Sequence, residues 1–352
     1  MQSRISPLAQ SLTPYVPGEQ PRAGEVWTKL NTNENPYPPS EDVRKAIDAA
    51  MGQLALYPDP CALSLREAIA QQNGVAVEEV FVGNGSDEVL AMCFPAFFAG
   101  QPYPVRFADI TYSFYKVYAS LFSVEAQIVP LRDDYTMDVG AFCMPQCSGI
   151  LIPNPNAPTG ILLETGEIQR ILRAHPDCVV VIDEAYIAFG GQSMVSWVRT
   201  YPNLLVVRTL SKSHALAGLR VGYAIGQKEL ITALTCIKDS FNSYPLDQLA
   251  QAGARAAILD EAYTRQQCQR VQHTRQWTTQ QLRMRGFTVL DSAANFVFAR
   301  PHEGDAARVH AALRARHVLV RYFPGLRTGQ WLRISIGTDA QMHALMEALD
   351  TI

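Results

Sequence analysis

The chain has 352 residues, a formal net charge of −3 at pH 7 and 18% charged residues. Single hydrophobic cores stop growing near roughly 250–300 residues, so this length predicts two cores. The lack of a basic surplus argues against a nucleic-acid partner. Residues 1–7 lack the apolar segment of a secretion signal, and no run reaches the ~18 apolar residues of a membrane span. We therefore expect a soluble, cytoplasmic protein without a membrane partner.

The cysteines predict neither a disulfide framework nor a metal site. They are odd in number and contain no CxxC pair, and several lie in apolar runs. Such cysteines are typical of reduced core thiols. His175 and the other histidines show no ligand spacing, so no metal is predicted. The seven cysteines are Cys61, Cys93, Cys143, Cys147, Cys178, Cys236 and Cys268.

Strand-like and helical patterns alternate from about residue 40 to residue 244. Helices are expected at 40–54 and 164–174, and Ser64 with Glu67 forms a capping box for a helix that Gly74 can end. This alternation predicts an α/β fold with a mostly parallel, doubly wound central sheet. The last two runs are too close for a helical crossover, so one of them is expected to be antiparallel. Strand-like runs lie at 80–82, 104–107, 126–131, 149–152, 178–182, 204–208 and 219–225.

The pattern of predicted helices and strands changes after Pro245. A long helical stretch over 246–285 precedes shorter alternating elements, which predict a smaller α+β unit. Its strands are expected at 287–290, 295–299 and 331–336, and its further helices at 305–316 and 339–350.

The first chemical signal is the Gly85-Ser86-Asp87 turn between a strand and a helical pattern. Backbone N–H groups at the start of a helix favour an anion, so this turn predicts a phosphate site. A nucleotide P-loop is the competing interpretation. We discount it because no Gly-Lys-Ser/Thr follows.

Two further polar groups follow apolar strands. Asn156 lies in a proline-rich turn, residues 152–160, which would hold it rigidly as a hydrogen-bond donor; an ordinary strand-to-helix turn is the alternative. Asp183 follows the run 178–181, where ligands bind at the carboxyl end of a parallel sheet, although a helix N-cap is also common there. Asp183 can pair with a protonated pyridine nitrogen, and Tyr186 could bond the 3-oxygen of the same ring.

Lys212 follows the apolar run 204–207. A desolvated lysine amine can condense with an aldehyde, while Ser211 and Arg220 offer a hydroxyl and a fixed cation for a phosphate ester. By itself this lysine is also compatible with a solvated loop. Together with Asn156 and Asp183, however, it predicts a pyridoxal 5′-phosphate site.

These motifs resemble those of the fold-type I pyridoxal-phosphate enzymes in the aspartate aminotransferase superfamily, and most closely the histidinol-phosphate aminotransferase family, a class II aminotransferase family. The resemblance extends from about Leu12 to the C-terminus. It implies an N-terminal arm, 1–38, that joins a small domain, 246–352, beside a large cofactor-binding domain, 39–245. The carrying segments are NPNAPTG at 154–160, DEAY at 183–186 and SKSHALAGLR at 211–220, with support from residues 30–38, 57–59, 83–88, 111–115 and 332–338.

The resemblance also implies residue roles. Lys212 holds the cofactor and moves the substrate α-proton, Asp183 pairs with the ring nitrogen, and Tyr186 acts with it. Asn156 and Tyr186 bond the ring 3-oxygen, while Tyr112 stacks on the ring. Gly85, Ser86, Asp87, Ser211 and Arg220 form the phosphate cradle. Tyr57 reaches the cofactor of a neighbouring subunit, which implies a homodimer with shared active sites.

For the substrate, the resemblance assigns Tyr15, Arg321 and Arg333 to a phosphate ester, beside Asn156. Two arginines and a phenol suit a dianion better than a carboxylate, although Arg321 could equally be a surface arginine. Arg327 is expected to be an exposed loop residue. His214 and Ala157 depart from the family pattern, but neither has an assigned catalytic role.

The expected reaction is transamination of L-histidinol phosphate with 2-oxoglutarate, giving imidazole-acetol phosphate and L-glutamate in histidine biosynthesis. Two alternatives use the same scaffold: an aromatic amino-acid aminotransferase and a threonine-phosphate decarboxylase. A non-catalytic, cofactor-binding regulator is a third. It would need an attached DNA-binding domain, and only about 30 residues precede the core.

Overall fold

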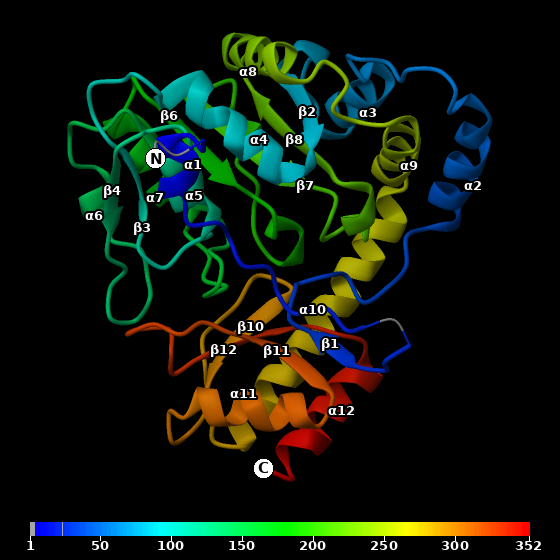
Figure 1. The fold of residues 1–352 in the computed structure, drawn as a ribbon, viewed down its shortest axis with the longest axis vertical. Coiled ribbons are helices and arrows are strands. Elements are labelled where there is room, and N and C mark those ends of the chain that lie inside the picture. Colours follow the sequence, from blue (N-terminus) through cyan, green and yellow to red (C-terminus); the bar gives the residue numbers. More distant parts are fainter. Residues whose placement is uncertain (1–3, 23) are drawn as a thin grey trace.

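The computed structural model describes residues 4–22 and 24–352. It contains a seven-stranded sheet and a five-stranded sheet. Figure 1 shows a large upper unit around the first sheet and a smaller lower unit around the second, with the helix α10 (Glu261–Met284) extending into the lower unit. No helix within the described residues is long and apolar enough to cross a membrane.

The large sheet has the strand order β2-β8-β7-β6-β5-β3-β4. All neighbouring pairs are parallel except those made by β8, which is antiparallel to β2 and β7. The expected α/β class, the mostly parallel sheet and the antiparallel strand near residue 220 are therefore confirmed. The strands are β2 (Val80–Asn84), β3 (Val105–Ala108), β4 (Ala126–Val129), β5 (Gly149–Pro153), β6 (Val179–Asp183), β7 (Leu204–Thr209) and β8 (Val221–Gly226).

Helices bury both faces of this sheet. Successive residues of β6 enter different cores: Val180 and Ile182 pack on one face, Val181 on the other. Burial on both faces explains why the central strands are continuous apolar runs rather than alternating ones. The helices of this unit are α2 (Glu41–Ala50), α3 (Leu63–Asn73), α4 (Gly85–Cys93), α5 (Phe114–Leu121), α6 (Val139–Phe142), α7 (Thr165–Ala174), α8 (Lys228–Phe241) and α9 (Gln248–Leu259).

The predicted capping box at Ser64 is wrong. Helix α3 begins at Leu63, and the Asp59 carboxylate accepts hydrogen bonds from the backbone N–H groups of Cys61 (2.9 Å) and Leu63 (2.7 Å). The Asp59 carboxylate thus caps the helix at Leu63, one residue before Ser64. Ser64 therefore lies inside the helix instead of capping it. Gly74 does end α3, in a left-handed conformation with φ 65°.

The small unit is built around the sheet β1-β11-β12-β10-β9. The N-terminal segment contributes β1, which pairs in parallel with β11, and the other pairs are antiparallel. Its strands are β1 (Thr28–Leu30), β9 (Thr288–Val289), β10 (Phe296–Arg300), β11 (Val318–Tyr322) and β12 (Leu332–Ser335). Its outer helices are α11 (Ala306–Ala315) and α12 (Asp339–Leu349), while the short α1 (Pro7–Ser11) lies near the N-terminus.

The helical stretch expected over 246–285 is two helices, α9 and α10, that meet at Asp260. The backbone N–H of Asp260 closes α9 on Ala256, and its carboxylate accepts from the N–H of Tyr263 in α10. Helix α9 packs against α2 and α3 and enters the core of the large unit, whereas α10 enters the core of the small unit. Packing of the large unit thus extends past Pro245. The division at residue 245 stays a prediction.

Candidate active site

A cavity of about 190 Å³ lies at the carboxyl ends of β5, β6 and β7 and at the start of α4. It brings together eight of the residues to which the resemblance assigns a role, although these come from positions 86 to 220. Its lining residues are Thr32, Glu34, Ser86, Asp87, Tyr112, Pro153, Ala157, Asp183, Ala185, Tyr186, Thr209, Ser211, Lys212, Ala217 and Arg220.

Lys212 follows β7 and points its amine into this cavity. The Nζ atom donates a hydrogen bond to the backbone carbonyl of Thr32 at 3.1 Å. Burial and the nearby Arg333 charge lower the pKa of Lys212 to about 8, against the opposing influence of Glu34. About one amine in ten is therefore neutral at pH 7, and the neutral amine is the form that attacks a carbonyl.

Asp183 is the last residue of β6 and is only 5% exposed. Its carboxylate accepts hydrogen bonds from the Tyr115 hydroxyl (3.0 Å) and the Ala185 backbone N–H (3.1 Å). Both donors are uncharged, and burial raises the pKa of Asp183 to about 6. A buried carboxylate held by neutral donors favours a cationic partner, which suits a protonated pyridine nitrogen.

The start of α4 is built to approach an anion. Gly85, with φ 79°, leads into the first turn, where a Cβ would lie 2.6 Å from Nη2 of Arg220. A Cβ at Gly222, in β8, would lie 2.2 Å from the backbone nitrogen of Ser86. Two glycines therefore let a helix N-terminus, a strand and a guanidinium meet in one place, which fits a phosphate ester.

The side chains around this cradle are already ordered. Nη2 of Arg220 forms an ion pair with Asp87 at 2.9 Å, and Arg220 itself has a left-handed backbone with φ 53°. The Thr209 hydroxyl donates to Oγ of the buried Ser211 at 3.0 Å. The hydroxyl of Tyr112 donates to the other oxygen of Asp87, which fixes its ring above the cavity. The left-handed backbone of Arg220 is an outlier of the kind that is typical of ligand sites.

The two predicted partners of a ring oxygen differ in what they offer. The Tyr186 hydroxyl accepts from Nδ2 of Asn33 at 3.0 Å, so its own proton stays available. The amide of Asn156 donates to the Ile110 carbonyl (3.1 Å) and the Thr159 hydroxyl (3.0 Å). Both its N–H groups are engaged, while its buried Oδ1 has no hydrogen-bond partner in the described part of the chain. The donor role of Asn156 stays a prediction that requires its amide to rotate.

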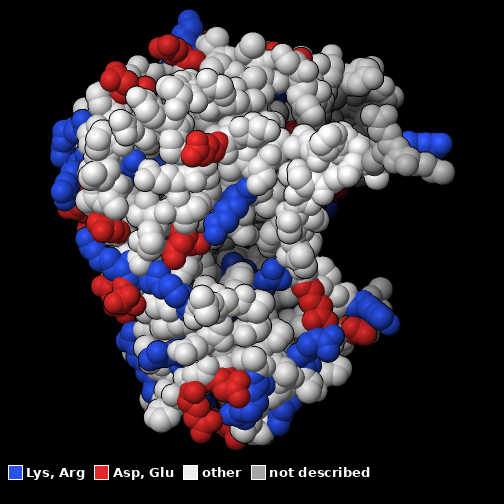
Figure 2. Space-filling model, turned by 60° about the vertical axis from the view of Figure 1, so that its left-hand side comes forward, with Lys and Arg blue, Asp and Glu red and all other residues white. Residues whose placement is uncertain are grey.

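A second cavity of about 450 Å³ adjoins the first and shares Tyr112 and Ala157 with it. Three cationic residues and one acidic residue line it, so its surface carries a positive excess. The residues that line this second cavity come from both units. Figure 2 shows that the molecular surface is hollowed between the two units. The lining residues are Tyr15, Asp109, Ile110, Thr111, Tyr112, Ser113, Lys116, Ala157, Pro158, Phe323, Leu326, Arg327, Thr328 and Arg333.

Two of the three residues assigned to the substrate phosphate line this second cavity. The ring of Tyr15 packs at a tilt against that of Phe114, with centroids 4.5 Å apart. Arg333 donates to the Asn31 carbonyl at 3.0 Å, and its buried Nε has no hydrogen-bond partner among residues 4–22 and 24–352. Arg321 lies next to this cavity rather than on its wall, and donates to the Val16 carbonyl at 2.9 Å.

Arg327 lies in a loop, as expected, but the expectation that it is exposed is wrong. Its guanidinium is half-buried at the second cavity and bonds Asp109 (3.1 Å) and the Leu131 carbonyl (2.9 Å) in the large unit. Thr32 and Glu34, which belong to the supporting segment 30–38 but were assigned no role, line the first cavity. These contacts join residues about 180 to 220 positions apart, and no local pattern signals them.

Tyr57 lies outside both cavities. Its side chain is 83% exposed, and its ring packs on Tyr244 with centroids 4.8 Å apart. An exposed tyrosine on a surface loop is compatible with reaching a second copy of the chain. Its role there stays a prediction.

Comparisons with known proteins identify the family of the chain. The family model described as aminotransferase class I and II matches residues 25–349. The chain is 54% identical over 349 residues to a histidinol-phosphate aminotransferase of Acetobacter pasteurianus, covering 99% of this chain and 97% of that protein. It is 55% identical over 348 residues to the protein of that name from Gluconacetobacter diazotrophicus, covering 99% and 97%.

A solved structure shows the same fold. The histidinol-phosphate aminotransferase of Sinorhizobium meliloti, in complex with pyridoxal-5′-phosphate, matches with a TM-score of 0.88 and 24% identity, covering 100% of this chain and 99% of that chain. The resemblance drawn from the sequence motifs is confirmed. The chain belongs to the class I and II aminotransferase family.

Proposed function

We propose that the protein transfers the amino group of L-histidinol phosphate to 2-oxoglutarate, giving imidazole-acetol phosphate and L-glutamate, a step of histidine biosynthesis. The relatives that are about 54% identical over nearly the whole chain carry the name of this activity. The observation that carries the substrate assignment is a pair of arginines beside the cofactor cavity.

Arg321 and Arg333 are direct partners across β11 and β12. Partners on neighbouring antiparallel strands share one face of the sheet, and like charges placed opposite each other destabilise it. Burial lowers the pKa of Arg333, so its charge is costly where it lies. A doubly charged phosphate ester between the two guanidinium groups would remove this repulsion, whereas an aromatic side chain would not.

The cofactor cavity supplies the chemical groups. Pyridoxal phosphate, when bound, supplies an electron-withdrawing ring that stabilises the negative charge left on the substrate α-carbon. The Lys212 amine accepts the α-proton in its neutral form, which its lowered pKa of about 8 populates near neutral pH. Asp183 stays largely ionised at pH 7 and holds the proton of the ring nitrogen. The free hydroxyl proton of Tyr186 is donated to the ring oxygen.

We place the working enzyme in the cytoplasm as a homodimer. The support for the dimer is Tyr57, which is 83% exposed and lies outside the cavities of its own chain. In a dimer this phenol would complete the phosphate cradle of the other copy. Replacement of Tyr57 with Phe would then weaken cofactor binding without changing the fold.

The direct test is a spectrum of the cofactor-loaded protein before and after L-histidinol phosphate is added without a keto acid. We expect the yellow absorbance of the Lys212-linked cofactor to disappear in a single turnover and to return when 2-oxoglutarate is added. An unchanged spectrum would reject this substrate. A response to L-phenylalanine instead would select the aromatic aminotransferase, and carbon dioxide release from threonine phosphate the decarboxylase.

The contact between the arginine pair and the phosphate can be tested from both sides, by replacing Arg333 in the enzyme and by using a substrate without the phosphate. Arg333→Ala should raise KM for histidinol phosphate about 10–150-fold, because charge-assisted hydrogen bonds contribute about 1.5–3 kcal/mol. The same variant should leave KM for L-histidinol, which lacks the phosphate, close to the wild-type value. Its kcat should fall with both substrates, because Arg333 also helps to lower the pKa of Lys212. Arg300→Ala, in the neighbouring strand β10, is the matched control. An equal rise of KM with both substrates would show that Arg333 does not bind the phosphate.

A further inference from the structure

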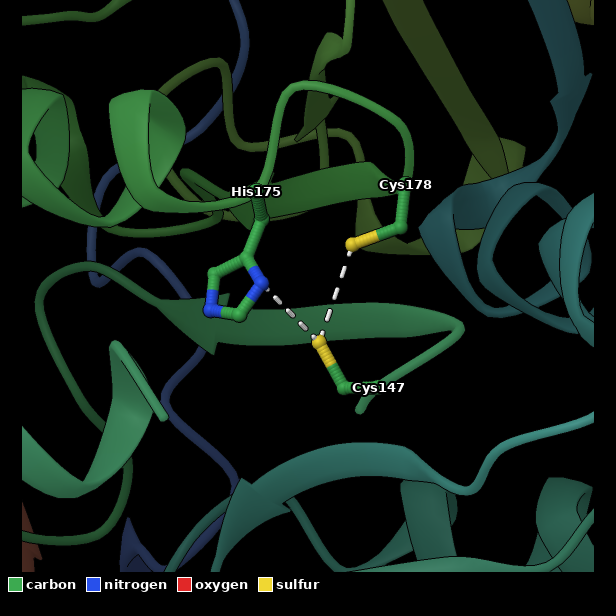
Figure 3. A group of neighbouring side chains, drawn as sticks. All are labelled: Cys147, His175 and Cys178. Carbon is green, nitrogen blue, oxygen red and sulfur yellow. Dashed lines mark hydrogen bonds between the residues drawn. The ribbon is translucent and has the colours of Figure 1, made fainter. Parts of the chain in front are cut away.

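Two thiols and an imidazole meet at the edge of the sheet opposite the active site. Cys147 lies just before β5, His175 directly after α7, and Cys178 just before β6. Figure 3 shows the three side chains pointing toward one another. Sγ of Cys147 lies 3.7 Å from Sγ of Cys178 and 3.4 Å from Nδ1 of His175. All three ligand atoms lie within 4.8 Å of one another.

Two of the three separations match the edges of a metal tetrahedron, and the third, between Sγ of Cys178 and Nδ1 of His175, lies within 4.8 Å. With zinc–sulfur distances of about 2.3 Å and zinc–nitrogen distances of about 2.0–2.1 Å, the S···S and S···N edges measure about 3.8 and 3.6 Å. The observed 3.7 and 3.4 Å fall within about 0.2 Å of these values. A disulfide would instead need a sulfur–sulfur bond of about 2.0 Å, and it would not involve the imidazole.

The imidazole is already oriented as a ligand. Nε2 of His175 donates to the Phe142 carbonyl at 2.8 Å. A carbonyl can only accept, so Nε2 carries a proton, and Nδ1 is the ring nitrogen that faces the thiols and can bind a metal in the neutral imidazole. The buried Arg106 donates to the same carbonyl and to that of Met144, which holds the loop in place. Such support behind a histidine ligand is typical of zinc sites.

The three side chains are largely buried, yet they border a cavity. Cys147 and His175 are 9% and 6% exposed, and Cys178 is half-buried. A cavity of about 590 Å³ borders all three residues and Asp177. It leaves room for a fourth ligand from solvent.

We propose that Cys147, His175 and Cys178 bind one zinc ion, with a water molecule in the fourth position. Thiolates and imidazole are the donors that select zinc over magnesium or calcium. In the bound state both sulfurs are thiolates and the imidazole is neutral, so the protons that these three side chains carry beforehand are released to solvent. The site lies one strand length, about 16 Å, from Asp183. The ion would therefore brace the loops before β5 and β6 rather than take part in transamination.

Metal content of the cofactor-loaded protein tests this proposal. The protein is treated with a chelator and dialysed against micromolar Zn²⁺, and bound zinc is measured by mass spectrometry. We expect one zinc per chain. With Co²⁺ in its place, we expect a thiolate-to-cobalt charge-transfer band and the visible bands of a tetrahedral ion. A wild-type protein that retains no zinc, or takes up cobalt without the thiolate band, would overturn the assignment.

Two variants locate the ion. Cys147→Ser and Cys178→Ser should each weaken zinc binding by more than about 100-fold, since even loss of a supporting residue costs about 10–100-fold. Cys236→Ser, at an exposed position in α8, is the matched control and should bind zinc as the wild type does. Equal zinc uptake by Cys147→Ser would place the ion elsewhere. Retained yellow cofactor in each variant shows that the fold is intact, whatever the metal result.

Discussion

The two ends of β5 and β6 carry different chemistry on the same strands. At the carboxyl end, Asp183 is buried with only neutral donors, and the Lys212 amine contacts a backbone carbonyl. At the amino end, Cys147, His175 and Cys178 contact one another and the backbone. At the first end, Asp183 and Lys212 form no ion pair, which makes them reactive toward a ligand. The second end concentrates soft donors that suit a fixed ion.

The largest difference between the ends should come from Lys212→Ala. Without its amine, the α-proton has no acceptor and the cofactor no covalent attachment, so kcat should fall by more than about 10⁴-fold. The protein should also be colourless after incubation with pyridoxal phosphate. Lys228→Ala, at an exposed position at the start of α8, should change neither property. Substantial steady-state turnover by Lys212→Ala would remove this lysine from the mechanism.

Asp183→Asn should lower kcat by about 10–1,000-fold. An amide cannot stabilise a protonated ring nitrogen, and losing a charge pair that shifts a pKa by about 1–3 units costs about 1.4–4 kcal/mol. The control is Asp177→Asn, an exposed acid at the amino end of the same strand. Steady-state kinetics with both variants compare the two ends directly. An unchanged rate for Asp183→Asn would exclude its proposed role.

Asp183 should also make the cofactor-free protein less stable as the pH rises. Burial raises its folded pKa from 3.8 to about 6. Between these values the folded state binds more protons than the unfolded state, so the free energy of unfolding falls as the pH increases. The 2.2-unit difference (6 − 3.8) corresponds to about 3 kcal/mol, complete near pH 7.

Urea unfolding between pH 4 and pH 7 measures this effect. Asp183→Asn has no carboxyl group to titrate, so its stability should lack this decrease. A wild type and variant with parallel pH profiles would show that the burial of Asp183 does not govern the dependence.

A smaller effect is expected from Gly222→Ala. The new Cβ would lie 2.2 Å from the backbone nitrogen of Ser86, so the start of α4 must move away from β8. Overpacking of this kind costs about 1–3 kcal/mol, which we expect as cofactor affinity reduced about 5–150-fold. Gly218→Ala has open space around it and is the matched control. Fluorescence titration with pyridoxal phosphate distinguishes the two, and equal affinities would contradict the cradle.

The smallest effect should be that of Cys178→Ser on catalysis. The amino end lies a strand length from the reaction, so kcat should stay within about twofold of wild type while zinc no longer raises the thermal unfolding temperature. A loss of activity that matches that of Asp183→Asn would show that the two ends are coupled.

The carboxyl end of the sheet was predictable from sequence because a general rule applies to it. The carboxyl ends of parallel strands lie side by side at that edge of the sheet. A polar residue directly after an apolar run, such as Asp183 or Lys212, therefore points toward the same crevice. Family motifs then added residue roles. The antiparallel β8 was predictable for a similar reason, since 11 residues between β7 and β8 leave no room for a helical crossover (221 − 209 − 1 = 11).

The remaining contacts depend on loops that no rule positions. Arg327 meets Asp109 across 218 positions, and Cys147 meets His175 across 28. The pattern for Ser64 was locally correct, but Asp59 satisfies the same helix start more directly. Sequence reasoning therefore located the cofactor residues and missed groups that become neighbours only through tertiary packing.

The junction between α9 and α10 has a mechanical consequence. Asp260 alone separates the two helices, and its backbone and carboxylate are bonded to both. A hinge made of one residue allows rotation about a point but little sliding. Helix α10, with its 24 residues, then acts as a lever about 36 Å long, in which a rotation of about 5° moves the far end by about 3 Å. A small torsional change at this one aspartate would thus be amplified along the length of α10.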